Sequence, residues 1–132
     1  MAKGMELTKS DALRAYARMM NTLDGSHFAP LLADNFHYAS QWVFEEITSK
    51  QAYLDYIMPK LTSIAESGSH AYAEMAELKA YGGGPCVVMA QGSKHNLLAT
   101  VLVEVEDGYI KRLDMCQIPP PSAAARTGEY PA

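Results

Sequence analysis

The chain has 132 residues, of which 48% are hydrophobic and 20% are charged, and its formal net charge is −4. This length and composition are typical of one globular domain that can bury a core. The negative charge and the scattered lysines and arginines argue against nucleic-acid binding. No apolar run is long enough to span a membrane, so we expect no membrane association.

The first residues, MAKGMELTKSD, contain no apolar segment of the kind that secretory signals carry. The two cysteines, Cys86 and Cys116, lie in no CxxC or Cys/His cluster, so we expect no metal site and no cofactor. Without a signal, both are predicted to be reduced thiols in a cytoplasmic protein.

Capping residues and apolar spacing in the N-terminal third of the chain predict two helices and two strands. After a loose lead-in over residues 1–7, the segment Thr8–Asp11 reads as a capping box that opens a helix ending at Asp24-Gly25. Ser26 is a plausible cap for a short second helix that closes at Asp34-Asn35. The apolar face of the first helix consists of Leu13, Tyr16, Ala17, Met20 and Leu23.

The segment Leu31 to Ser40, LLADNFHYAS, is expected to be the end of that short helix running into a strand over Phe36–Ser40. A second strand is predicted over Gln41–Ile47. Thr48–Gln51 reads as another capping box, opening a helix that ends at Ser67-Gly68 and contains Pro59, which should kink it.

Everything after His70 reads as strands, joined by short turns into a curved antiparallel meander. The predicted strands cover residues 71–81, 86–93, 97–106 and 109–117, and Asp107-Gly108 is a hairpin signal. The domain is therefore expected to span residues 8–117. The tail over residues 118–132 is Pro-rich and is predicted to be extended or disordered, with an arm on a partner subunit as the alternative.

This order of elements, with LLADNFHYAS and the capped helix Thr48–Gly68 as its most specific pieces, resembles the NTF2-like superfamily, which is also named SnoaL-like or ketosteroid-isomerase-like. The resemblance implies an α+β fold in which a curved antiparallel or mixed sheet forms a cone around the long N-terminal helix, with a pocket at its open end. It also implies a homodimer through the outer sheet face, with Leu102, Thr100 and Met75 as contacts. The superfamily hosts many unrelated functions, so the fold alone does not fix one.

Ketosteroid isomerase requires a carboxylate base, a tyrosine and a protonated acid, a system that is among the standard worked cases of pKa tuning. The tyrosine matches Tyr16. The base position is Ser40, whose neutral hydroxyl cannot replace a carboxylate without an activating partner. The acid position falls on Ala99 to Val101, so two of the three groups are missing and we do not expect that mechanism.

Histidines or an aspartate would serve a dehydratase or cyclase. His37 should point away from the pocket, His95 lies in a turn and His70 precedes a strand, so surface roles are favoured for all three. Asp114 should face outward and pair with Arg112 or Lys94. Strand acids at Glu74, Glu77, Glu104 and Glu106 are expected on a solvated face, and Cys86 is expected to be a buried thiol.

The predicted pocket wall is apolar and aromatic with a few polar groups. We expect it to bind a small, largely apolar molecule. The alternatives are an isomerase, dehydratase or polyketide cyclase with Tyr16, Tyr38 and Ser40 at its site, and a non-catalytic dimeric interaction module. The residues predicted to line the pocket are Tyr16, Met20, Phe28, Phe36, Tyr38, Ser40, Trp42, Tyr53, Ile57, Met89, Gln91, Val101, Leu113, Met115 and Gln117.

Overall fold

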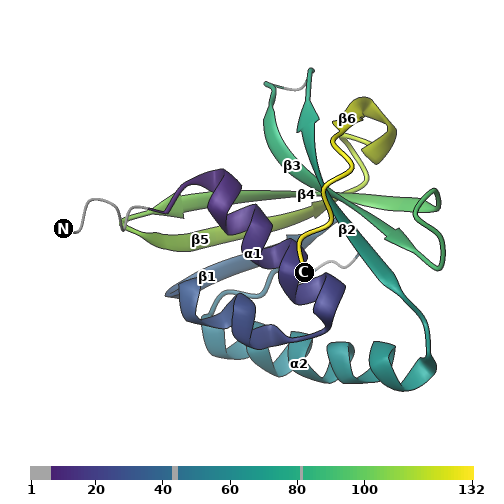
Figure 1. Cartoon of the computed structure of the whole chain (residues 1–132). Coiled ribbons are helices and arrows are strands. Elements are labelled where there is room, and N and C mark those ends of the chain that lie inside the picture. The colour runs from purple at the N-terminus through teal and green to yellow at the C-terminus, as the bar shows by residue number, and fades with distance from the viewer. Residues whose placement is uncertain (1–6, 43–44, 81) are drawn as a thin grey trace.

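A curved mixed sheet folds around helix α1 in the computed structural model, which describes residues 7–42, 45–80 and 82–132 (Figure 1). Helix α1 packs on β2, β3 and β4, whereas α2 packs on β1. The elements in chain order are α1 (Lys9–Thr22), the 3-10 turns η2 (Gly25–His27) and η3 (Ala29–Leu31), β1 (Leu32–Ser40), α2 (Lys50–Ser67), β2 (Ala71–Leu78), β3 (Gly84–Gln91), β4 (Leu97–Glu106), β5 (Tyr109–Cys116), the 3-10 turn η4 (Pro121–Ala123) and β6 (Ala124–Arg126).

The strands lie in the order β1-β5-β4-β3-β2-β6. Strand β1 runs parallel to β5, and the other neighbours are antiparallel. The hairpin signal is confirmed, because Asp107 and Gly108 both take positive φ angles, 55° and 80°, between β4 and β5. Two positive φ angles in succession are what a type I′ turn requires.

The predicted capping box opens α1. The Thr8 hydroxyl accepts a hydrogen bond from the backbone N–H of Asp11, and the Asp11 carboxylate accepts one from the N–H of Thr8. The helix ends earlier than predicted, because Leu23 takes the left-handed conformation with φ 57°. The predicted apolar face is correct, since Leu13, Tyr16 and Met20 are buried.

The prediction for LLADNFHYAS is wrong in its first half. In place of a short helix, two 3-10 turns follow Asp24, whose side chain caps the first of them. Pro30 lies inside the second turn and cannot supply the N–H that a longer helix would need. The strand therefore starts at Leu32, and Leu32 and Phe36 alternate inward from it.

The predicted second strand, Gln41–Ile47, is also wrong in the described residues. Gln41 and Trp42 form a turn, and Ile47 makes only an isolated bridge to Tyr38, while residues 43 and 44 lie outside the described part. Helix α2 is capped by Ser49, whose hydroxyl accepts from the N–H of Ala52, so the expected capping box at Thr48 is replaced by a simple cap.

The meander follows the prediction closely. Strand β4 has its predicted bounds, and β3 begins two residues early because Gly84 and Pro85 already pair with β2. The predicted end of β2 at Tyr81 lies outside the described residues, and the strand ends at Leu78.

The sheet buries apolar side chains on both faces. The inner face, with Val87, Val101 and Leu113, packs on the helices. A second cluster on the outer face joins Ala76, Leu78, Cys86 and Val88, with Leu102 and Ala124 against it.

This arrangement corrects part of the predicted dimer surface. Met75 belongs to the inner core, so it is not an outer-face contact. Thr100 is 0% exposed within the single chain, and Leu102 is half-buried. The homodimer itself stays a prediction.

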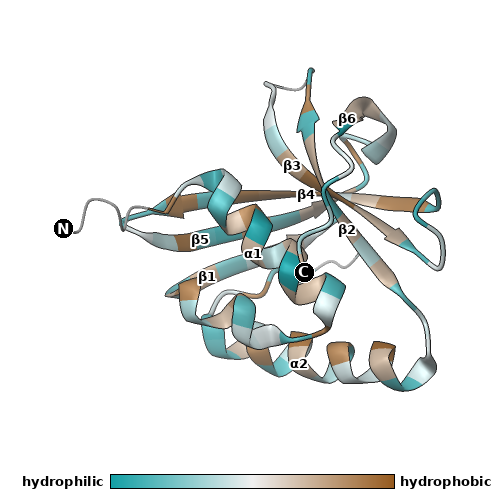
Figure 2. Cartoon of the chain, viewed as in Figure 1, coloured by the Kyte–Doolittle hydropathy of each residue, from teal (hydrophilic) through white to brown (hydrophobic). Residues whose placement is uncertain are grey.

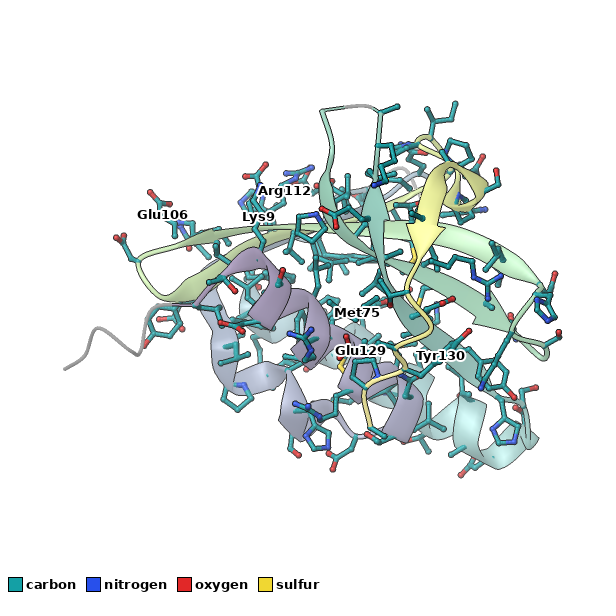
Figure 3. All side chains as sticks on the ribbon, turned by 45° about the horizontal axis from the view of Figure 1, so that its top comes forward. Lys9, Met75, Glu106, Arg112, Glu129 and Tyr130 are labelled. Carbon is teal, nitrogen blue, oxygen red and sulfur yellow. The ribbon has the colours of Figure 1, made fainter. Side chains whose placement is uncertain are left out.

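The C-terminal segment is folded beyond residue 117, contrary to the expectation of a loose end. Turn η4 packs on β4, and β6 then pairs with β2 at the sheet edge. Figure 3 shows Glu129 and Tyr130 beside Met75 of β2, whose N–H donates to the carbonyl of Glu129. The last residues reach α1, where Asn21 donates to the carbonyl of Pro131 and Arg14 pairs with Glu129.

No helix in the described residues is long and apolar enough to cross a membrane. The hydrophobic and hydrophilic residues are interspersed along α2, as Figure 2 shows. Residues 7–42, 45–80 and 82–132 also contain no group of three or more histidines, cysteines or acids that could hold a metal ion.

Candidate functional site

A cavity of about 340 Å³ lies between the two helices and strands β1 to β5. Helix α1 supplies Tyr16 and Met20 to its wall, and α2 supplies a face that begins at Tyr53. The lining residues are Tyr16, Met20, Tyr38, Ser40, Trp42, Tyr53, Tyr56, Ile57, Lys60, Ile64, His70, Ala71, Met89, Ala90, Gln91, Leu98, Ala99 and Met115.

An aromatic cluster forms the inner wall. The rings of Tyr38 and Tyr53 lie 5.3 Å apart between centroids, and those of Tyr38 and Tyr56 lie 5.6 Å apart. Phe28 and Phe36 pack edge-to-face behind them, with 5.0 Å between Phe36 and Tyr53. Such pairs add stability beyond simple burial, so they hold the wall rigid.

Two hydroxyl groups in this wall lack a partner. Tyr16 and Tyr53 are each only 1% exposed, and neither hydroxyl makes a hydrogen bond to any residue that the structure describes. Burial raises the pKa of both phenols above the ordinary value, and the neighbouring tyrosines raise it further. Both groups therefore stay protonated and can donate a hydrogen bond to an oxygen inside the cavity.

Tyr38 lies nearer the opening. Burial is the main reason that its pKa is raised, Tyr56 raises it further, and Ser40 acts in the opposite direction. The Ser40 hydroxyl accepts a hydrogen bond from the backbone N–H of Trp42, so it is held in place by the turn that follows β1. The hydroxyl makes no hydrogen bond to a histidine or carboxylate among the described residues, so nothing there activates it as a nucleophile.

The charged side chain of the cavity wall, Lys60, lies at the mouth of the cavity. Lys60 donates a hydrogen bond of 3.1 Å to the hydroxyl of Tyr56, and its ammonium lies 5.3 Å from the centre of that ring. His70 stacks on Tyr72 at 6.0 Å and also lines the cavity. No aspartate or glutamate is among the described lining residues.

Most residues predicted for the pocket do line this cavity, namely Tyr16, Met20, Tyr38, Ser40, Trp42, Tyr53, Ile57, Met89, Gln91 and Met115. Four others, Phe28, Phe36, Val101 and Leu113, are fully buried in the core behind the wall. Gln117 is exposed, and its backbone N–H donates to the side chain of Gln41. Four of these five were expected on strands, where alternation gives the face of a residue but not its depth along the sheet. Phe28 was expected on the buried side of the short second helix.

The sequence analysis missed several lining residues, above all Tyr56, Lys60 and Ile64. Tyr56 and Lys60 follow Tyr53 and Ile57 by three residues each, and Ile64 follows Lys60 by four, which places all of them on the same face of α2. That spacing was the available signal. Ala90, Leu98 and Ala99 were not identifiable, because a register shift between Met89 and Ala90 changes which side chains face inward.

The remaining catalytic candidates lie outside the cavity. His37 pairs with Glu46. Asp114 pairs with Arg112 at 3.0 Å, the first of its two predicted partners. His95 is exposed in its turn.

Two predictions for buried groups have different outcomes. Cys86 is fully buried, as expected, and burial raises the pKa of its thiol to about 11. Glu74 was expected on a solvated face, but it is 3% exposed because the C-terminal segment covers it.

The curved mixed sheet, the two helices and the cavity between them define the NTF2-like α+β fold, as the resemblance implied. Similar solved structures include a SnoaL-like protein of unknown function from Burkholderia thailandensis, with a TM-score of 0.60 and 15% identity over 96% of this chain and 98% of that one. An NTF2-like protein of unknown function from Cytophaga hutchinsonii has a TM-score of 0.59 and 15% identity, covering 90% of this chain and 97% of that one.

An LEH-like epoxide hydrolase from M. tuberculosis is similar at a TM-score of 0.52 and 16% identity, covering 81% of this chain and 82% of that one. No protein-family model matches the sequence, and no curated protein matches it. At these identities the likeness shows the fold alone, so function has to be argued from the cavity.

Proposed function

We propose that this protein binds a small, largely apolar molecule in the cavity between α1, α2 and the sheet. The observation that carries the proposal is that Tyr16 and Tyr53, each 1% exposed, line the cavity while their hydroxyls make no hydrogen bond to another described residue. A buried tyrosine hydroxyl normally has a hydrogen-bond partner, because leaving it unpaired costs free energy. A ligand oxygen in the cavity supplies that partner.

The size and chemistry of the wall support the same proposal. Small-molecule sites range over about 300–1,000 Å³ and are mostly apolar with a few polar groups. The volume of about 340 Å³ is at the low end of that range and favours a compact ligand. Met20, Ile57 and Met89 supply the apolar contacts.

The enzymatic alternative is an isomerase, dehydratase or cyclase acting in the same cavity, with Tyr16, Tyr38 and Ser40 as the groups nearest the substrate. Such reactions need a proton acceptor of suitable pKa within hydrogen-bond reach. No carboxylate stands among the described lining residues, Ser40 is bonded to the backbone of its own turn, and the lining histidine, His70, stacks on Tyr72. The geometry therefore supports binding more directly than proton transfer.

The sequence also suggested a cytoplasmic homodimer or an interaction module. We retain both as proposals, with one adjustment. The C-terminal segment covers part of the outer sheet face, so a sheet-mediated dimer would form over the part left exposed, around Leu102 and Glu104. Light scattering after size-exclusion chromatography measures the mass directly, and a monomer at all concentrations would contradict the dimer.

Thermal unfolding with a neutral two-ring probe, 2-naphthol, tests the binding proposal. A ligand that binds only the folded state raises the melting temperature, and the rise increases with the ratio of ligand concentration to dissociation constant. We expect 2-naphthol to raise it, and we expect Tyr16→Phe and Tyr53→Phe to reduce the shift without destabilising the ligand-free protein. Tyr109→Phe, at an exposed tyrosine that does not line the cavity, is the matched control.

If the two tyrosines only fill the core, the probe will shift all four proteins equally or not at all. Native mass spectrometry of the protein as purified is the independent readout. Absence of any shift together with a mass equal to that of the bare chain would contradict the proposal.

A further inference from the structure

We infer that the ligand of this cavity is an amphipathic monoanion, with an anionic group held at Lys60 and a neutral oxygen held inside at Tyr16 and Tyr53. The inference rests on the proposed binding function and adds the ligand class. It depends on how charge is distributed over the cavity wall, from a cationic mouth to an uncharged interior.

The cation at the mouth of the cavity is Lys60, and it is not paired with a carboxylate among the described residues. Lys60 contacts the hydroxyl and ring of Tyr56, and no aspartate or glutamate lies within ion-pair distance of it in the described residues. Several other cations of the chain are paired differently: Arg14, Arg112 and Arg126 each have a carboxylate at 3.0 Å or less. On α2 itself, the positions one turn before and after Lys60 hold Tyr56, Ile57 and Ile64 among others, and none of them is acidic.

The wall adds no negative charge. All lining residues within the described part of the chain are apolar, aromatic or neutral polar, apart from Lys60 and the histidine His70. A cationic ligand would therefore find no counter-ion there. An anion at the mouth gains attraction from Lys60, and because Lys60 is exposed, salt screens that attraction.

The inner end requires a neutral group. Tyr16 and Tyr53 are almost completely buried, and their raised pKa keeps them uncharged. A second charge beside them would lose its hydration without a counter-ion, which is costly. A hydroxyl or carbonyl oxygen can instead accept a hydrogen bond from either phenol.

The two ends are separated along one helix. Tyr53 and Lys60 lie about two turns apart on α2, which places their Cα atoms about 10 Å apart along the axis. Met20, Ile57 and Met89 line the space with apolar groups. A rigid two-ring body with polar groups at opposite ends therefore matches the wall better than a molecule with one polar end.

The test uses four probes with one skeleton: naphthalene, 2-naphthol, 2-naphthoate and 6-hydroxy-2-naphthoate. Dissociation constants are measured for the full-length protein by calorimetry. We expect 6-hydroxy-2-naphthoate to bind tightest, and we expect the carboxylate to improve binding about fivefold at low salt, a gain that declines as salt rises. Lys60→Met should abolish the carboxylate gain, measured as the ratio of the affinities for 2-naphthoate and naphthalene in the same variant, and Lys60→Arg should retain it.

Lys79→Met, at an exposed lysine that does not line the cavity, is the control for net charge. Tyr16→Phe should reduce the gain from the hydroxyl and leave the gain from the carboxylate. Binding of 2-naphthol that Tyr16→Phe weakens, with no carboxylate gain in the unmodified protein, would overturn this inference and leave the proposed function standing. No binding of any probe would overturn both.

Discussion

The buried carboxylate of Glu74 anchors the C-terminal segment, and its removal should measurably destabilise the protein. Glu74 accepts hydrogen bonds from the Arg126 guanidinium at 2.7 Å, the Gly128 N–H at 2.7 Å and the Tyr130 hydroxyl at 3.1 Å. Its side chain is 4% exposed. Nearly every polar contact of this carboxylate is therefore made with one segment that lies more than 50 residues later in the chain.

The magnitude follows from those contacts. A hydrogen bond to a charged group contributes about 1.5–3 kcal/mol, and neighbouring bonds are not additive. Detachment of the segment also returns its donors to water, which limits the loss. We expect Glu74→Ala to lower the free energy of unfolding by about 3 kcal/mol, and Glu74→Gln, which keeps an acceptor oxygen, by about half of that.

The pH dependence provides a second readout. Burial by itself raises the pKa of Glu74, but the bonds from Arg126, Gly128 and Tyr130 outweigh it, and the net pKa lies below the ordinary value of 4.5. The folded state therefore binds its proton more weakly than the unfolded state. This contribution to stability is fully present above pH 4.5 and is lost as the pH falls through the folded-state pKa.

Urea unfolding followed by the fluorescence of Trp42, the single tryptophan, measures these free energies at pH 7 and at lower pH. Glu77→Ala, at an exposed glutamate on the same strand, is the matched control and should change little. Amide hydrogen exchange at Thr127 and Gly128 should speed up in the Glu74 variants alone. An unfolding free energy for Glu74→Ala within about 0.5 kcal/mol of the unmodified protein would refute the anchoring role.

Two further predictions concern other buried groups. The Thr100 hydroxyl is buried without a hydrogen-bond partner, so Thr100→Val should raise the free energy of unfolding by about 1 kcal/mol, measured by urea unfolding; a loss of stability would show that the hydroxyl is satisfied in solution. Burial raises the pKa of the Cys86 thiol to about 11, so iodoacetamide at pH 8 should leave it unmodified in the folded protein and alkylate it in urea, as mass spectrometry would show. Rapid alkylation of Cys86 in the folded protein would contradict this prediction, because it would show that the reagent reaches the thiol without unfolding.

The sequence by itself determined the elements whose signals are local. A helix cap is made by residues three apart, as Thr8 and Asp11 are, and a tight turn needs only two residues, as Asp107 and Gly108 show. Alternation along a strand is local in the same way, and in β4 it places Val101 and Val103 in the core. The NTF2-like fold and most of the cavity wall followed from the order and spacing of such signals.

The tertiary structure alone decided what depends on distant partners. Prolines and the lack of apolar periodicity suggested a loose tail, but Glu74 binds Arg126 across the sheet edge, and no local pattern records that pairing. The charge of the cavity wall also depends on packing between parts of the chain that are distant in sequence. Nothing in the sequence distinguishes Lys60 from the other lysines. It lines the mouth of the cavity only because packing turns its face of α2 toward the sheet. Burial and charge at a site are set by the neighbours that packing brings together, so they are fixed by the folded chain as a whole.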